Sequence, residues 1–355
     1  MRSTKLPSWT ERLLGLSPVP VPPHVFALSD RHLRYGQFVR ASGGFRFRAY
    51  RSVALPADAF HSGILGGPLR DPRAFEQLVK NLVSELPGSL RDASLIIPDS
   101  WLRVTFTEIT EVPKAADARD EVLRWKLKRL VPFRVDELRI GAVEVTPLPQ
   151  QEEPRRLLLG FAIEQLLAQL EDAFAAAGVR LGQIANLSLS LIASLADDAE
   201  ARADREAALG SLASQASTSR AVRFGALVVV EEGGYTLAFV RRGEPVLHRF
   251  KAFTGALPEE ARAGFVSRDL KLTRNFLDEH FPGSLLSWVL LVAPTGLEPI
   301  WLSRLEGGLG LPAAPLDGRH LPPLQVEGTA VGPTGAAPPW REVAAMLGAA
   351  RREVA

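Results

Sequence analysis

Residues 97–104 read IPDSWLRV, and VP follows at 112–113 and VLRWKLKRLVPF at 122–133. The apolar run 93–97 stops at Pro98, which cannot donate a backbone hydrogen bond, so the run predicts a buried strand that ends there. Residues 103–109 predict a second strand. Leu123, Leu127 and Leu130 recur at helical spacing in a helix predicted over 115–130. Strands alternating with a helix are typical of an α/β protein.

A similar set of short strands occurs in each half of the chain. Strands predicted at 33–40 and 45–55 flank Gly43 and Gly44, and strands predicted at 226–230 and 235–240 flank Gly233 and Gly234. Glycine pairs between strands are typical of hairpin turns. Further periodic segments predict helices at 71–86, 163–174, 266–281 and 297–306, and a buried strand at 285–292. The repetition predicts a duplicated α/β domain.

These patterns divide the chain into five regions. We expect an amphipathic segment and proline-rich spacer at 1–23, a first domain with an inserted subdomain at 24–198, a linker at 199–222, a second domain at 223–322, and a Gly/Pro-rich linker with a helix returning to the first domain at 323–355. In the first region, Trp9, Leu13, Leu14 and Leu16 predict a short amphipathic element. It could contact a membrane surface, a partner or its own domain.

Composition excludes several classes of function. The 355 residues contain no cysteine, and the six histidines show no metal-ligand spacing, so we expect no metal site. A net charge of +2 gives the whole chain little attraction for nucleic acid. No apolar run approaches the roughly 20 residues of a membrane span, and no signal peptide is recognisable, so we expect a cytoplasmic protein. Ser188 and Ser190 lack the Gly-x-Ser-x-Gly elbow of a hydrolase nucleophile.

The IPD strand ending, the VP that follows and the basic helix ending in PF resemble the type IV pilus assembly protein PilM family. The resemblance extends more weakly over most of the chain. It implies an actin-like fold of the actin, Hsp70 and sugar-kinase type, with duplicated domains around a cleft. It also implies two phosphate-binding hairpins with an aspartate and a glycine each, and a Gly-Gly turn against adenosine.

This chain departs from that nucleotide-binding pattern at all three motifs. Alignment on the hairpins places Ala27 and Ser29 at the first aspartate and glycine, Val229 and Glu231 at the second pair, and Pro294 in the adenosine turn. Without the aspartates there is no metal ligand, and side chains at the glycine positions block the approach of backbone N–H groups to phosphates. We therefore expect no catalysis and no cofactor. ATP with Mg²⁺ is the alternative, in which Asp30, Glu231 and Glu232 would form a shifted metal site.

The resemblance implies a scaffold that binds the cytoplasmic N-terminal peptide of an inner-membrane PilN-like protein, at the cytoplasmic face of the inner membrane. We expect at most peripheral membrane contact, and self-association into a ring is possible. The region that carries the motif supplies the candidate peptide-binding residues, which are Pro98, Val112, Pro113, Trp125, Pro132 and Phe133. Alternatives are a divergent actin-like ATPase of the same machine, a type II secretion platform protein of the GspL class, and a sugar-kinase-like enzyme.

Overall fold

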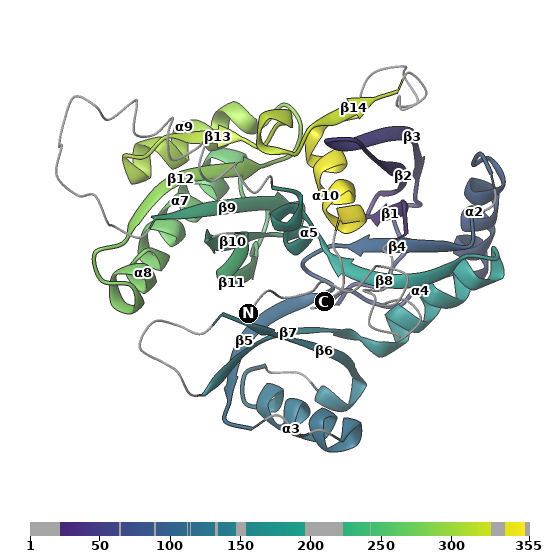
Figure 1. Ribbon diagram of the computed structural model, residues 1–355, viewed down its shortest axis with the longest axis horizontal. Coiled ribbons are helices and arrows are strands. Elements are labelled where there is room, and N and C mark those ends of the chain that lie inside the picture. The colour runs from purple at the N-terminus through teal and green to yellow at the C-terminus, as the bar shows by residue number, and fades with distance from the viewer. Residues whose placement is uncertain are drawn as a thin grey trace, which may run out of the picture.

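The computed structural model describes residues 22–351 except 64, 89, 112, 114, 132–133, 147–153, 196–222, 242 and 328–337. The predicted linker 199–222 and all but the last two residues of the predicted segment 1–23 lie outside this description. Within it, the structure comprises three β-sheets with helices packed on them (Figure 1). No helix among the described residues has the length and apolar character needed to cross a bilayer.

The first large sheet has six strands in the order β14-β3-β2-β1-β4-β8. Its strands are β1 (His24–Leu28), β2 (His32–Ala41), β3 (Gly44–Ala54), β4 (Asp92–Ile97), β8 (Arg180–Asn186) and β14 (Leu324–Val326). β1, β2 and β3 form the antiparallel meander expected from the sequence, whereas β4 and β8 continue the sheet in parallel. β14 comes from the far end of the chain and pairs with β3, so the chain returns to this sheet after building the second one.

Helices cover both faces of this sheet. α2 (Pro72–Ser84) and α4 (Glu164–Ala176) pack on one face, and α5 (Leu187–Ser194) and α10 (Trp340–Arg351) pack on the other. Asp71 caps α2, because its Oδ1 accepts a hydrogen bond from the N–H of Ala74 at 3.0 Å. Phe75, Val79 and Leu82 then lie on the buried side of that helix.

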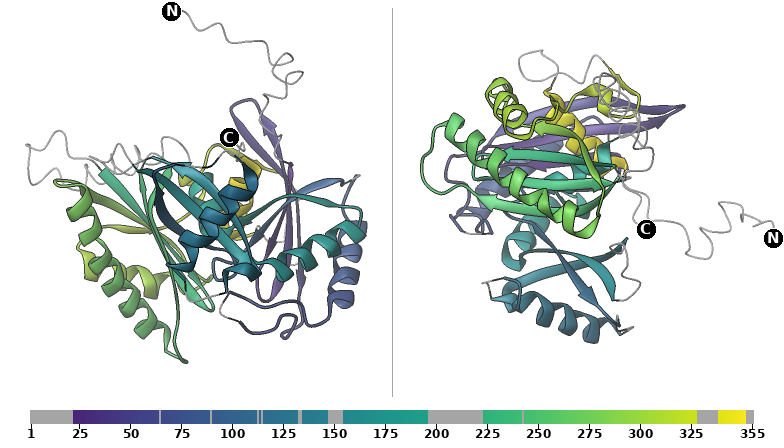
Figure 2. Two further views of the ribbon diagram at one scale, coloured as in Figure 1. Left: turned by 90° about the horizontal axis from the view of Figure 1, so that it is seen from below. Right: turned by 90° about the vertical axis from the view of Figure 1, so that its left-hand side faces the viewer.

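A small antiparallel sheet is inserted between β4 and α4. It has the order β5-β7-β6 and consists of β5 (Arg103–Ile109), β6 (Leu138–Val145) and β7 (Arg155–Ile163), accompanied by α3 (Ala116–Lys128) and the 3-10 turn η1 (Val135–Glu137). The right-hand view of Figure 2 shows this insertion protruding from the two larger sheets. Its own small core packs Leu123, Leu157 and Leu159 against Ile109.

The second large sheet repeats the opening of the first. Its order is β11-β10-β9-β12-β13, with β9 (Arg223–Glu231), β10 (Gly234–Arg241), β11 (Glu244–Ala252), β12 (Leu285–Val292) and β13 (Ala313–Pro315). Around it lie α7 (Glu259–Thr273), α8 (Asn275–His280), α9 (Glu298–Leu309) and η2 (Gly318–His320). Gly233 lies in the hairpin turn between β9 and β10, and β12 adds in parallel to β9 as β4 does to β1.

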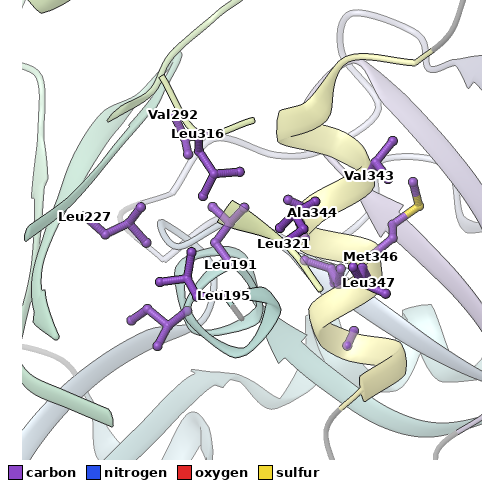
Figure 3. Packing of buried hydrophobic residues seen from close by; sticks show 14 of the residues in the cluster. Leu191, Leu195, Leu227, Val292, Leu316, Leu321, Val343, Ala344, Met346 and Leu347 are labelled. Carbon is purple, nitrogen blue, oxygen red and sulfur yellow. The ribbon is translucent and has the colours of Figure 1, made fainter. Parts of the chain in front are cut away.

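One apolar core joins the two large sheets. α10 places Val343, Met346 and Leu347 against strands β1 and β4 of the first sheet and against helix α5. The same cluster contains Leu227 and Val292 from the second sheet, as Figure 3 shows. Because these side chains are shared, the two domains are packed together through hydrophobic burial as well as through the chain.

Candidate functional site

A cleft lies between the two large sheets and holds a cavity of about 440 Å³. The five positions at which the nucleotide motifs are degenerate all line it: Ala27, Ser29, Val229, Glu231 and Pro294. The sequence alignment on two hairpins therefore selected residues that the fold brings together. Asp30 and Glu232, which were considered as members of a shifted metal site, also line this cavity.

The two hairpins that face each other across the cleft are bound to one another directly. Arg31, in the turn between β1 and β2, donates from Nε to Oε2 of Glu232 at 2.9 Å, and Glu232 lies in the turn after β9. The Ser29 hydroxyl oxygen accepts from the N–H of His32 at 3.1 Å, which closes the first turn on itself. Ser29 and Arg31 of the first hairpin are thus engaged within the protein.

The interior of the cleft contains a second set of charged contacts. Nε of Arg34 on β2 lies 3.0 Å from Oε1 of Glu342 on α10, and only 16% and 13% of the two side chains are exposed. Arg341 donates from Nη1 to the carbonyl oxygen of Ala293 at 2.9 Å, next to Pro294. Burial lowers the pKa of Arg341. These contacts join α10 to both domains in the space between the sheets.

Two carboxyl groups in the cleft have raised pKa values. Burial raises the pKa of Glu231 well above its ordinary range, and the nearby carboxylate of Asp99 raises it further. Burial, with Glu232 close by, raises the pKa of Asp30. Groups that resist ionisation are poor ligands for a metal ion, and the described residues contain no cluster of three or more His, Asp or Glu able to hold one.

A buried polar network centred on Asp99 lies beside the cleft. Its Oδ1 accepts from the backbone N–H of Ser188 at 2.9 Å, and its Oδ2 accepts from the Thr236 hydroxyl at 2.6 Å. Ser188 Oγ lies 2.6 Å from Nε2 of His248. The network joins the end of β4 and the start of α5 to β10 and β11 of the second domain.

This Ser, His and Asp set does not have the geometry of a hydrolase triad. Asp99 binds the backbone of Ser188, while Nδ1 of His248 has no hydrogen-bond partner among the residues that the structure describes. Ser188 is fully buried, so a substrate has no access to it. Sequence reasoning gave Asp99 no role. The signal available was a polar residue directly after a buried strand, within the stretch that carries the family resemblance.

A separate apolar groove lies along the edge of the first large sheet, with a volume of about 600 Å³. One wall is β8, with Leu181, Gly182 and Ile184, and the other is the inserted sheet, with Ala142 and Val143 of β6 among its lining residues. The other apolar lining residues are Leu102, Val104, Ile140, Leu158, Phe161, Ala162, Leu167 and Leu189. At one end Arg139 is paired with both Glu164 and Glu171.

The three predicted peptide-binding residues that the structure describes lie in different places. Pro98 lines the interdomain cleft, Pro113 is partly buried beyond β5, and Trp125 is 55% exposed on α3. Val112, Pro132 and Phe133 lie outside the described residues. Within the region 98–133 that was singled out, Leu102 and Val104 line the groove. Its remaining walls come from β6, β7, β8, α4 and α5, which all lie outside that region.

Two domains that each open with a three-stranded meander, share a core and enclose a cleft define an actin-like fold. The chain has the fold of a chain in a solved "PilM-PilN type IV pilus biogenesis complex", with a TM-score of 0.68 and 16% sequence identity, covering 95% of this chain and 100% of that chain. The fold expected from the sequence resemblance is therefore confirmed.

Two weaker structural likenesses have TM-scores below 0.5 and add no weight. A Bacteroides thetaiotaomicron protein with an actin-like ATPase fold and unknown function gives a TM-score of 0.47 at 9% identity, covering 88% of this chain and 94% of that one. The cytoplasmic domain of EpsL, an inner-membrane component of the Vibrio cholerae type II secretion system, gives 0.41 at 10% identity, covering 86% and 89%. No protein-family model and no curated protein sequence matches the chain.

Proposed function

We propose that this protein is a non-catalytic scaffold of a type IV pilus or related envelope assembly machine. It would bind a cytoplasmic peptide of an inner-membrane, PilN-like partner in the apolar groove. The observation that carries this proposal is the groove itself, which combines apolar walls with two sheet edges. The likeness in fold to a chain of a PilM-PilN complex supports the choice of partner.

The groove suits an extended peptide because backbone and side-chain contacts are available together. β8 ends the large sheet and β6 ends the inserted sheet, and among the described residues neither has a neighbouring strand on its outer side. A peptide that adds to a sheet edge gains main-chain hydrogen bonds, and alternate side chains enter apolar pockets. Gly141 leaves space beside the backbone of the β6 edge, since a Cβ there would meet no atom within 4 Å.

The cleft supports the non-catalytic part of the proposal. An actin-like nucleotide site needs open backbone donors and carboxylates ready to hold a metal ion and its water. Here Arg31 and Glu232 join the hairpins, and Glu231 is a carboxyl group that resists ionisation beside Asp99. A triphosphate would have to displace one ion pair and face additional carboxylates.

The location and assembly follow from the partner. A protein that binds the cytoplasmic end of a membrane-anchored partner works at the cytoplasmic face of the inner membrane, and self-association into a ring would give it several partners at once. A GspL-like role in type II secretion is the alternative. The identity of the bound membrane protein therefore decides between the two machines.

The test compares two exposed valines on strands. Val143 of β6 lines the groove and is 49% exposed, whereas Val326 of β14 is 50% exposed and lies away from it. We expect Val143→Asp to weaken binding of the partner's synthetic N-terminal peptide at least about 10-fold, equivalent to about 1.4 kcal/mol, because a charge would enter a desolvated apolar contact. Val326→Asp should bind like the wild type in isothermal titration calorimetry.

Salt provides a second criterion for the same experiment. Binding through apolar side chains and backbone hydrogen bonds should change little between about 50 and 500 mM salt, because such contacts are not screened. Loss of binding at high salt would instead indicate association through the basic helix α3, which carries Arg124, Lys126, Lys128 and Arg129 near its end. Equal effects of the two aspartate variants would contradict the groove as the binding site.

A further inference from the structure

The described part of the chain begins at the wall of the apolar groove. Pro22 is partly buried, and its Cγ lies 3.8 Å from the position that a Cβ on Gly182 would occupy. Gly182 is itself a lining residue of the groove. The backbone then continues through Pro23, whose carbonyl oxygen accepts from the N–H of Phe38 and fixes the start of β1. Residues 1–21 therefore connect to the fold beside the groove.

The sequence just before Pro22 has the composition of a groove ligand. Trp9, Leu13, Leu14 and Leu16 are apolar, and between them and β1 stand four prolines at positions 18, 20, 22 and 23. Proline favours extended polyproline geometry, which rises about 3.1 Å per residue. Leu16 lies six residues before Pro22, so it reaches about 19 Å from the groove wall, and a seven-residue strand such as β8 is about 23 Å long.

We infer that residues 9–16 of this chain occupy its own groove and compete with the partner peptide. This inference rests on the proposed function of the groove. The groove offers apolar walls and two strand edges that no other described strand pairs with, and the segment supplies apolar side chains on a tether that starts at the wall. A short tether gives an effective concentration in the millimolar range, so a contact with a dissociation constant below that range keeps the groove largely filled. The partner peptide must therefore bind the groove tightly enough to displace this segment.

The chain is suited to a cross-linking test, because it contains no cysteine. Three full-length variants would each carry Val143→Cys with one of Leu13→Cys, Leu14→Cys or Leu16→Cys. The matched control joins Leu13→Cys to Leu272→Cys, since Leu272 is 61% exposed on α7 of the second domain. Mild oxidation followed by non-reducing electrophoresis and peptide mapping reports the disulfide formed.

We expect at least one groove variant to form an intramolecular disulfide several-fold more than the control does, as an effective concentration in the millimolar range requires. Adding Ala142→Asp to that variant should reduce the cross-link, because docking is apolar. Equal cross-linking of groove and control variants would overturn the inference. Disulfide-linked dimers in place of the intramolecular product would also overturn it, since they would place the segment in the groove of a second copy.

The cross-linking result does not depend on the partner. If the cross-link fails, the proposed partner site can still be correct, because the Val143→Asp peptide titration tests it separately. If that titration fails, the chain's own segment can still occupy the groove. When both hold, the partner peptide added to the full-length groove variant should suppress the intramolecular disulfide in proportion to its occupancy.

Discussion

Glu231 ends β9 at the boundary between the domains, where the backbone N–H of Asp99 donates to its Oε2 at 3.1 Å. Burial and the Asp99 carboxylate both favour the neutral form, and Arg341 opposes them as a smaller influence. The pKa of Glu231 is therefore higher in the folded protein than in the unfolded chain. Since the folded state binds this proton more tightly, the stability that Glu231 contributes is greatest at low pH and falls as the pH rises above about 4.5.

We predict that Glu231→Gln raises the free energy of unfolding by about 1 kcal/mol at pH ~8, because the amide keeps an acceptor for Asp99 and removes a poorly compensated buried charge. The gain should disappear at or below about pH 4, where Glu231 is protonated in both states. Guanidinium unfolding at the two pH values measures it.

The control is Glu232→Gln, because this neighbour is 58% exposed in its ion pair with Arg31. An exposed pair contributes about 0–1 kcal/mol, so this variant should be neutral or slightly destabilised at neutral pH. A Glu231→Gln protein that is less stable than the wild type at pH ~8 would mean that the carboxylate is charged and well paired there.

The last helix, α10, shows how tightly the elements are packed. Its residues 343–350 are all buried, and it lies against α5. A Cβ placed on Gly348 would lie 1.7 Å from the carbonyl oxygen of Ser190. The absence of a side chain at this position allows the two helix backbones to approach each other.

We predict that Gly348→Ala lowers the free energy of unfolding by about 2 kcal/mol or more, since the methyl group would force α10 away from α5. Gly264→Ala in α7 is the matched control, because a Cβ there would meet no atom within 4 Å. It should stabilise the protein by up to about 1 kcal/mol through helix propensity. Thermal unfolding followed by circular dichroism compares the two, and a tolerated Gly348→Ala would show that the helices are not in close contact.

Several elements were predictable because their patterns are local. The meander strands are bounded by glycine turns, and α2 has its aspartate cap, so both agree with expectation. β7 was missed because Leu157, Leu158 and Leu159 are all buried, and a strand covered on both faces shows no alternation. β8 reads RLGQIAN, which has no clear periodicity. Since these two strands form much of the groove, the groove could not be located from the sequence.

Contacts between the domains could not be predicted from the sequence either. The five degenerate nucleotide positions in the cleft could be identified from the sequence, because two hairpins fix the register of the residues around them. The hydrogen bond from Thr236 to Asp99 joins residues 137 positions apart, and no local pattern signals such a pair. The fold class followed from the repeated meander and the family resemblance.

At the scale of the whole molecule, the cleft is bridged by the protein itself. The shared apolar core, the ion pair between Arg31 and Glu232, and the Asp99 network all cross between the domains. We predict that isothermal titration calorimetry with Mg-ATP detects no binding, because Arg31 and Glu232 pair between the two hairpins and Glu231 resists ionisation. Micromolar affinity, or ATP hydrolysis that Asp30→Asn abolishes, would support the divergent ATPase instead.

The return of the chain to its first sheet has a consequence for the order of events on the ribosome. β1 and β4 are synthesised early, yet the face of that sheet that carries Val25 and Ile96 is covered by α10, which contains residues 340–351. Until α10 emerges, only α5 covers part of this apolar face, and an exposed face of this kind attracts chaperones or neighbouring nascent chains. The domain begun first is completed last, so a truncated translation product ending before Trp340 would lack the helix that covers this face.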